Sequence, residues 1–143
     1  MTLAELARLA GVSRTTASYV MNGQGAARRI KPETIERVLA LARAHNFQVD
    51  AQAAALRGGA SRTLGFILPD LENSSYARLA KLLEQGARAQ GYQLLIAGSD
   101  DDPDTEQSLA LALKARRCDA LIVASALAQD DPFYPGLQQD GLP

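Results

Sequence analysis

Apolar side chains in the first fifty residues recur every three or four positions, the period of helices with one buried face. Thr2 and Glu5 have the spacing of a capping box, and Gly11 suits the left-handed residue that ends a helix. Ser13, a strong N-cap, precedes a second such stretch, and Pro32 suits the first turn of a third. The pattern predicts three helices, of which the first two form a helix-turn-helix.

After residue 62 the pattern changes to apolar runs separated by amphipathic stretches. The runs are 63–69, 93–97 and 119–125, and the predicted helices are 76–90 and a second one beginning at Pro103. Strands that are apolar throughout are typical of parallel sheets with helices on both faces. The predicted fold is therefore an all-α helix-turn-helix headpiece followed by an incomplete α/β parallel-sheet lobe.

A short alanine-rich stretch, Asp50–Arg57, connects the two patterns. Its composition favours a helix with Asp50 as N-cap and Gly58 as stop. It is shorter than the ~12–15 residues that an isolated helix needs in water, so we expect another molecule to order it. The alternative is a plain linker between domains, in which the alanines are incidental.

Composition excludes several classes of protein. The lone Cys118 cannot form an internal disulfide, and a single His45 leaves no plausible zinc set. No apolar run reaches the roughly 18 residues of a membrane span, and no secretory signal begins the chain. We therefore expect a cytoplasmic protein without membrane contact.

No nucleophile elbow or glycine-rich phosphate loop is present, so we predict no enzyme, no catalytic residue, no metal and no cofactor. The triplet Asp100–Asp102 is interpreted as a helix start.

Charge divides the chain in the same place as the pattern. Residues 1–62 carry nine basic and four acidic side chains, a net charge of +5, and the remainder has a net charge of −6. A basic domain followed by an acidic one indicates that only the first meets a polyanion, although the clustering could be accidental.

The second predicted helix carries side chains suited to DNA. Arg14, Thr15 and Tyr19 lie where a recognition helix reaches base edges in the major groove. A second set is suited to phosphate oxygens, which fix register and carry no sequence information. This phosphate set consists of Thr2, Ser13, Thr16, Ser18, Asn22, Arg28 and Arg29. Taken singly, Ser13, Thr16 and Ser18 could instead cap the helix or face solvent.

The segment Thr2–Asn22 resembles the headpiece of the lactose/galactose-repressor family. The resemblance includes the run Ala-Gly-Val-Ser-Arg-Thr-Thr-Ala-Ser-Tyr-Val-Met-Asn. Three segments are similar to sequences of the fructose-repressor subgroup of that family, namely Ser13–Val20, Pro69–Tyr76 and Gly91–Ala97. The resemblance implies a transcriptional regulator of carbohydrate metabolism genes that binds a near-palindromic double-stranded operator. It also implies a homodimer or tetramer in the full-length form, and a sugar-phosphate effector of the fructose 1-phosphate type.

The resemblance also implies roles for later residues. A hinge helix would fold on DNA, with Ala53 and Leu56 facing the minor groove and the leucine wedging between bases. Phe47-Gln48-Val49-Asp50 departs here from the family's Tyr-x-Pro-Asn. Effector donors would come from the loops that follow the strands, where ligands of such sheets bind. These candidates are Asn73, Ser74, Ser75 and Ser99.

These expectations divide the chain into three parts. Residues 1–48 are the headpiece, 49–61 the hinge helix and linker, and 62–143 the N-terminal part of an effector-binding and dimerisation domain that is truncated. Two alternatives remain open. One is an α/β sugar-binding module whose helical N-terminus makes only protein contacts, and the other is a non-functional remnant of a longer repressor.

Overall fold

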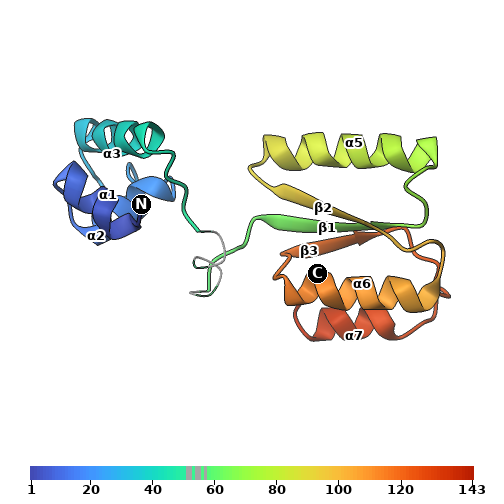
Figure 1. Ribbon diagram of the computed structural model, residues 1–143. Coiled ribbons are helices and arrows are strands. Elements are labelled where there is room, and N and C mark those ends of the chain that lie inside the picture. Colours follow the sequence, from blue (N-terminus) through green and yellow to red (C-terminus); the bar gives the residue numbers. More distant parts are fainter. Residues whose placement is uncertain (51–52, 54–55, 57) are drawn as a thin grey trace. The chain divides into compact units, whose positions relative to one another are not determined.

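The structure, a computed structural model, describes residues 1–50, 53, 56 and 58–143. The chain divides into two compact units, Met1–Asp50 and Ala51–Pro143 (Figure 1). The first unit is all helical, and the second is a three-stranded parallel sheet between helices. Both classes of fold were predicted from the sequence.

The first unit consists of α1 (Leu3–Ala10), α2 (Arg14–Met21) and α3 (Pro32–Ala44). The local signals act as expected: Thr2 and Glu5 form the capping box, and Gly11 is left-handed with φ 66°. Leu6, Val20 and Val38 meet in a buried core, one from each helix. In addition, Nε of Arg37 in α3 donates to the carbonyl of Ala10 at 3.0 Å, which ties α3 to the end of α1.

The glycine-rich segment between α2 and α3 is folded into turns. The amide of Gln24 donates to the carbonyl of Tyr19 at 2.8 Å, and the amide of Arg28 donates to the carbonyl of Gln24 at 3.0 Å. Gly25 is buried, and a Cβ there would lie 2.8 Å from Cδ1 of Ile35 in α3. Glycine at this position therefore lets the segment approach α3 closely.

The sheet of the second unit has the strand order β2-β1-β3, with all pairs parallel. Its strands are β1 (Thr63–Leu68), β2 (Gln93–Gly98) and β3 (Ala120–Val123). Helix α5 (Ser74–Ala89) covers one face, while α6 (Pro103–Ala115) and α7 (Phe133–Gln139) lie on the other (Figure 1). Because Leu68 pairs with Gly98, the carboxyl ends of β1 and β2 meet at one edge.

Strand β1 is buried on both faces, which gives the unit two apolar cores. Phe66 and Leu68 pack with Ala80 of α5, and Ile67 packs with Ala110 of α6 and Leu137 of α7. The backbone at Gly65 passes so close to α6 and β3 that a Cβ would lie 2.9 Å from Cδ1 of Leu113.

The second unit differs from the sequence prediction in four details. Helix α5 begins at Ser74, two residues before the predicted start, because Asn73 is its N-cap. Its residues Leu79 and Leu82 are 41% and 57% exposed, although apolar side chains of the predicted amphipathic helix 76–90 would be expected to face the core. Strand β2 is an edge strand: Leu94 is buried, Leu95 is half-buried and Ile96 is exposed. Helix α7 was not predicted.

The start of β1 is joined to the start of β3 by Asp119. Its carboxylate accepts from the amide of Ser61 at 2.8 Å, the hydroxyl of Ser61 at 2.9 Å and the amide of Arg62 at 2.9 Å. Arg62 has a left-handed φ of 54°, a conformation that costs free energy in residues other than glycine. These three hydrogen bonds, called here the Asp119 anchor, hold the turn by which the chain enters the sheet.

Two glycine substitutions should change the stability of the second unit in opposite directions. Gly65→Ala should lower the free energy of unfolding by about 1–3 kcal/mol, because its methyl group would collide with Leu113 and with Leu121. Gly86→Ala is the matched control, since a Cβ there meets nothing within 4 Å and the residue lies inside α5. It should raise the free energy of unfolding by about 0.5–1 kcal/mol. Urea unfolding checks both, and equal effects would contradict the close packing of β1.

Candidate DNA-binding surface

The N-terminus of α2 is fixed by two hydroxyl side chains. The Ser13 Oγ accepts from the amide of Thr16 at 3.1 Å and also lies 2.9 Å from Oγ1 of Thr16. The two side chains therefore cap the helix, which is the local role that the sequence left open for them. Each hydroxyl keeps further hydrogen-bonding capacity, and the helix N-terminus itself favours an anion.

The outward face of α2 carries the three predicted base-reading residues. Ala17 and Val20 are buried against the other helices, so the opposite side of α2 faces away from the core. Arg14 and Thr15 are exposed in the first turn, and Tyr19 is half-buried one turn later. The structure thus brings the three onto the surface of one short helix.

Two other members of the predicted phosphate set are bound to each other. The Nδ2 of Asn22 donates to the carbonyl of Ser18 at 2.8 Å and lies 3.4 Å from its Oγ. In α1, Thr2 Oγ1 accepts from the Glu5 amide at 3.2 Å, while a Glu5 carboxylate oxygen accepts from the Thr2 amide at 2.7 Å. The hydrogen bond from the Thr2 amide to the Glu5 carboxylate, followed by that of the Thr2 side chain, lowers the pKa of Glu5, so a negative charge sits beside Thr2.

The two arginines of the segment before α3 differ in their surroundings. The guanidinium carbon of Arg28 lies 4.5 Å from the centroid of the Tyr19 ring, within the range of a cation–π contact. Arg29 is exposed, left-handed with φ 56°, and has no ion pair or ring contact with the described residues. Sequence reasoning gave both arginines the same role and missed the stacking, for which no sequence signal exists.

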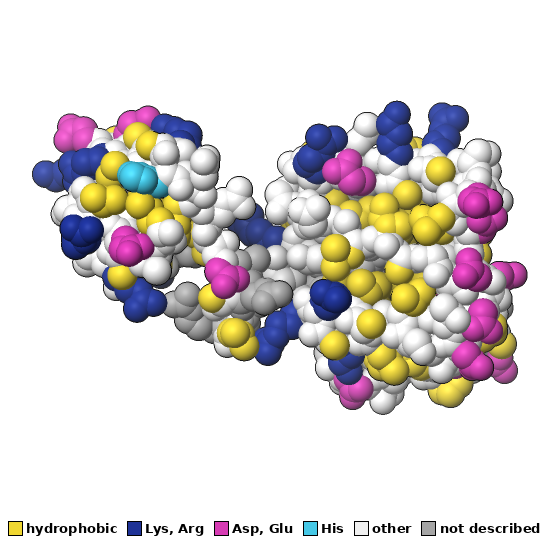
Figure 2. Space-filling model, in the orientation of Figure 1, with side chains coloured by type: hydrophobic (Ala, Val, Ile, Leu, Met, Phe, Trp, Pro, Cys, Tyr) yellow, Lys and Arg dark blue, Asp and Glu magenta, His cyan; other side chains and the backbone are white. Residues whose placement is uncertain are grey.

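Figure 2 shows the charge difference between the units. Lys and Arg side chains are scattered over the visible face of the first unit, while acidic side chains gather where the strands of the second unit end. That edge includes Asp70, Glu72 and the triplet Asp100–Asp102. The triplet begins α6 as predicted, with Asp102 accepting from the amide of Thr105 at 2.9 Å. The hydrogen bond from the Thr105 hydroxyl, followed by that from the Thr105 amide, lowers the pKa of Asp102.

The predicted hinge residues are only partly covered by the described structure. Leu56 is 67% exposed and Ala53 is half-buried. The other residues of the expected hinge helix, 51–52, 54–55 and 57, lie outside the described residues. The hinge helix and its minor-groove contact therefore stay predictions.

The predicted effector donors lie at the edge where the strands end, but not all are open to it. Asn73 Oδ1 accepts from the amide of Ser75 at 3.0 Å and so begins α5, where Ser74 and Ser75 are exposed. Ser99 is fully buried, and its hydroxyl donates to the carbonyl of Leu68 at 3.4 Å. Ser99 would have to give up that contact to bind an effector.

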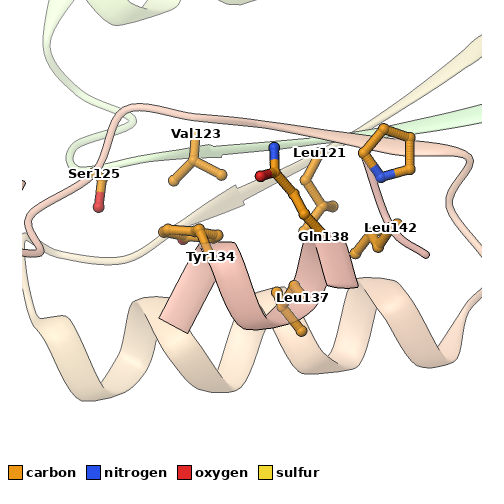
Figure 3. Close-up of a pocket in the computed structure, with 8 residues that line it drawn as sticks. Leu121, Val123, Ser125, Tyr134, Leu137, Gln138 and Leu142 are labelled. Atoms are coloured by element: carbon orange, nitrogen blue, oxygen red, sulfur yellow. The ribbon is translucent and has the colours of Figure 1, made fainter. Parts of the chain in front are cut away.

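A buried carboxylate near the same edge was missed by sequence reasoning. Glu106 of α6 is fully buried, and its oxygens accept from the Ser125 hydroxyl, the Ala126 amide at 2.7 Å and the Tyr134 hydroxyl at 2.7 Å. Burial, followed by the Glu106 contact, raises the pKa of Tyr134. Ser125 and Tyr134 also line a pocket of about 250 Å³ between β3 and α7 (Figure 3). Glu106 thus holds the segment after β3 against α6.

Within the described part of the chain, no cluster of three or more His, Cys, Asp or Glu side chains could hold a metal ion. None of the helices described there is long and apolar enough to cross a membrane.

Two family profiles match the chain. "Bacterial regulatory proteins, lacI family" matches residues 2–50, and "Periplasmic binding proteins and sugar binding domain of LacI family" matches residues 61–134. Both agree with the resemblance that the sequence motifs gave.

Individual relatives support the same assignment. The chain is 57% identical along its whole length to the fructose operon regulatory protein of Vibrio cholerae and spans 44% of that protein. It is 70% identical to the Cra transcriptional dual regulator of Pseudomonas putida, solved with fructose 1-phosphate, over 57% of this chain and 30% of that one, with a TM-score of 0.56. The lac repressor dimer bound to operator matches this whole chain and 43% of its own, with a TM-score of 0.79, and at 22% identity this match shows the fold alone. The chain therefore spans less than half the length of each of these relatives.

Tyr134→Phe should lower the stability of the second unit by about 1–3 kcal/mol, because it removes a hydrogen bond to the buried carboxylate of Glu106. Tyr92→Phe is the matched control, since the Tyr92 hydroxyl has no hydrogen-bond partner among the described residues, and this variant should unfold like wild type. Chemical unfolding followed by circular dichroism measures both. Equal stability of the two variants would show that Tyr134 does not hold α7 through Glu106.

Proposed function

Because the chain belongs to the LacI family of bacterial regulatory proteins, we propose that it is a sequence-specific DNA-binding regulator of carbohydrate metabolism genes. The supporting observation is α2, an N-capped helix with one face buried and Arg14, Thr15 and Tyr19 on the other. A helix of this kind fits the major groove, which presents a distinct donor and acceptor pattern for each base pair. The protein would act in the cytoplasm, and we propose no enzymatic activity.

Arg14, Thr15 and Tyr19 are proposed to contact base edges. Thr2, Ser13, Thr16, Ser18, Asn22, Arg28 and Arg29 are proposed to lie along the phosphates. The exposed N-terminus of α2 supports this division, because helix amide groups and short hydroxyl side chains are common phosphate donors. Such contacts set the register of the helix in the groove but do not distinguish sequences.

The proposed operator is near-palindromic and is bound by a dimer. Exposed apolar side chains on α5 and β2 support self-association: Leu79, Leu82 and Ile96 are 41%, 57% and 42% exposed. Ile96 is two residues from Leu94, which packs on α5, so it shares the α5 face of the sheet. Figure 2 shows hydrophobic side chains gathered on the visible face of this unit. Within the hinge helix and linker, 49–61, Ala53 and Leu56 are proposed to face the minor groove at the operator centre.

The proposed effector of the longer, family-type protein is a sugar phosphate such as fructose 1-phosphate, which the Pseudomonas putida relative binds in its crystal structure. Asn73, Ser74, Ser75 and Ser99 are the proposed contacts from this chain. They lie among acidic side chains, whereas a phosphate dianion is bound strongly by arginine or lysine. The loops 70–76, 98–102 and 125–127 contain no arginine or lysine, so the positive charge for such a ligand would have to come from outside these loops.

Arg14→Ala and Tyr19→Ala should each relax base discrimination at one or two positions of every half-site by roughly 1–3 kcal/mol. Ser18→Ala is the control, since a lost phosphate contact should weaken binding to all sequences about equally. The measurement is gel-shift competition with a near-palindromic site selected from a randomised DNA pool. An unchanged specificity profile for Arg14→Ala would contradict the assignment of α2, and the absence of any shifted complex with wild type would contradict DNA binding itself.

The 143 residues should not be released from DNA by fructose 1-phosphate. The loops 70–76 and 98–102 offer hydroxyl and amide groups but carry only acidic charge themselves, so they should bind a phosphate dianion weakly. A weakly bound ligand has little differential affinity with which to shift the chain away from its DNA-bound state. Calorimetry of the purified chain with fructose 1-phosphate tests this, with the Pseudomonas putida relative as positive control. Saturable micromolar binding to the 143-residue chain would contradict the expectation.

A further inference from the structure

Arg28 and Arg29 are adjacent, but only Arg28 stacks on an aromatic ring. Its guanidinium carbon lies 4.5 Å from the centroid of the Tyr19 ring. Arg28 has no acidic partner among the described residues, so no ion pair competes with the stacking. A planar guanidinium is well suited to such a contact, and arginine makes it more often than lysine does.

The backbone that carries Arg28 is held in place from both sides. On the α2 side, the amide of Gln24 donates to the carbonyl of Tyr19, and the amide of Arg28 donates to the carbonyl of Gln24. On the α3 side, Gly25 lies against Ile35, and the amide of Ile30 donates to the carbonyl of Gly25 at 3.0 Å. The backbone that carries Arg28 is therefore held in place while the side chain stacks on Tyr19.

The stacking restricts the ring of Tyr19 on the surface of α2. Tyr19 is half-buried, one turn after the exposed Arg14 and Thr15. A side chain that is already ordered loses less conformational entropy when it makes a contact. A guanidinium above the ring also occupies a face that a base or a methyl group could otherwise approach.

We propose that Arg28 is a positioning residue for base reading: by stacking on Tyr19 it fixes the orientation in which that ring meets the major groove, while Arg29 serves as a simple phosphate contact. The inference rests on the proposed function, because it assigns a specificity role within the same DNA-binding surface. In this role Arg28 helps to determine which operator sequence is bound, although it lies outside the recognition helix α2.

The test is a double-mutant cycle in the full chain, with Arg28→Ala, Tyr19→Ala, the double variant and Arg29→Ala as the control for lost charge. Discrimination at each half-site position is measured by competition binding. Arg28→Ala should reduce discrimination about two- to fivefold at the positions that Tyr19→Ala affects. In the Tyr19→Ala background, Arg28→Ala should cause no further loss of discrimination. Arg29→Ala should weaken all sequences equally.

A second measurement needs no DNA. In nuclear magnetic resonance spectra of the wild-type chain, the δ-methylene protons of Arg28 should be shifted upfield by the Tyr19 ring, and the shift should vanish in Tyr19→Ala. Absence of the shift, or unchanged discrimination between sequences in Arg28→Ala, would overturn the positioning role and leave the proposed function intact. A wild-type chain that binds no operator would overturn both, which distinguishes the two failures.

Discussion

An eight-residue helix is not stable alone in water, so α2 exists only because Ala17 and Val20 are buried against α1 and α3. This burial decides which side of α2 remains open, and every proposed base contact lies on that open side. The caps at Thr2 and Ser13 and the Arg37 contact to α1 support the same packing. The proposed DNA-binding surface is thus the reverse side of a small hydrophobic core.

The second unit is built around a different constraint, the burial of β1 on both faces. Parallel strands need helical crossovers, and the two crossovers place α5 on one face of the sheet and α6 on the other. All carboxyl ends then meet at one edge, where Glu106 is buried and the exposed acidic side chains gather. The same topology leaves β2 at the edge, with Ile96 exposed.

Local signals predicted most of the fold, since caps and periodicity act over a few residues, as at Ser13 and Pro32. The missed features depend on contacts between distant residues or contradict local preference. Helix α7 contains proline and glycine, which disfavour a helix, and the burial of Glu106 depends on Tyr134, 28 positions away. Of the candidate site, the helix and its outward residues followed from the pattern. The stacking of Arg28 did not, because it needs the folded path of the segment after α2.

The Asp119 anchor has a consequence for building hybrid regulators. Ser61 and Arg62 precede the sheet in sequence, yet their hydrogen bonds to Asp119 make them part of the fold of the second unit. A chimera that joins a foreign headpiece at Thr63 would replace Ser61 and Arg62, so Asp119 would lose the Ser61 hydroxyl as a donor. It would keep its two backbone donors only if the foreign turn places its amides in the same positions. A junction placed before Ser61 keeps the three residues together. The useful splice point therefore lies before Ser61. The foreign headpiece then ends upstream of the turn, and the second unit keeps the complete Asp119 anchor.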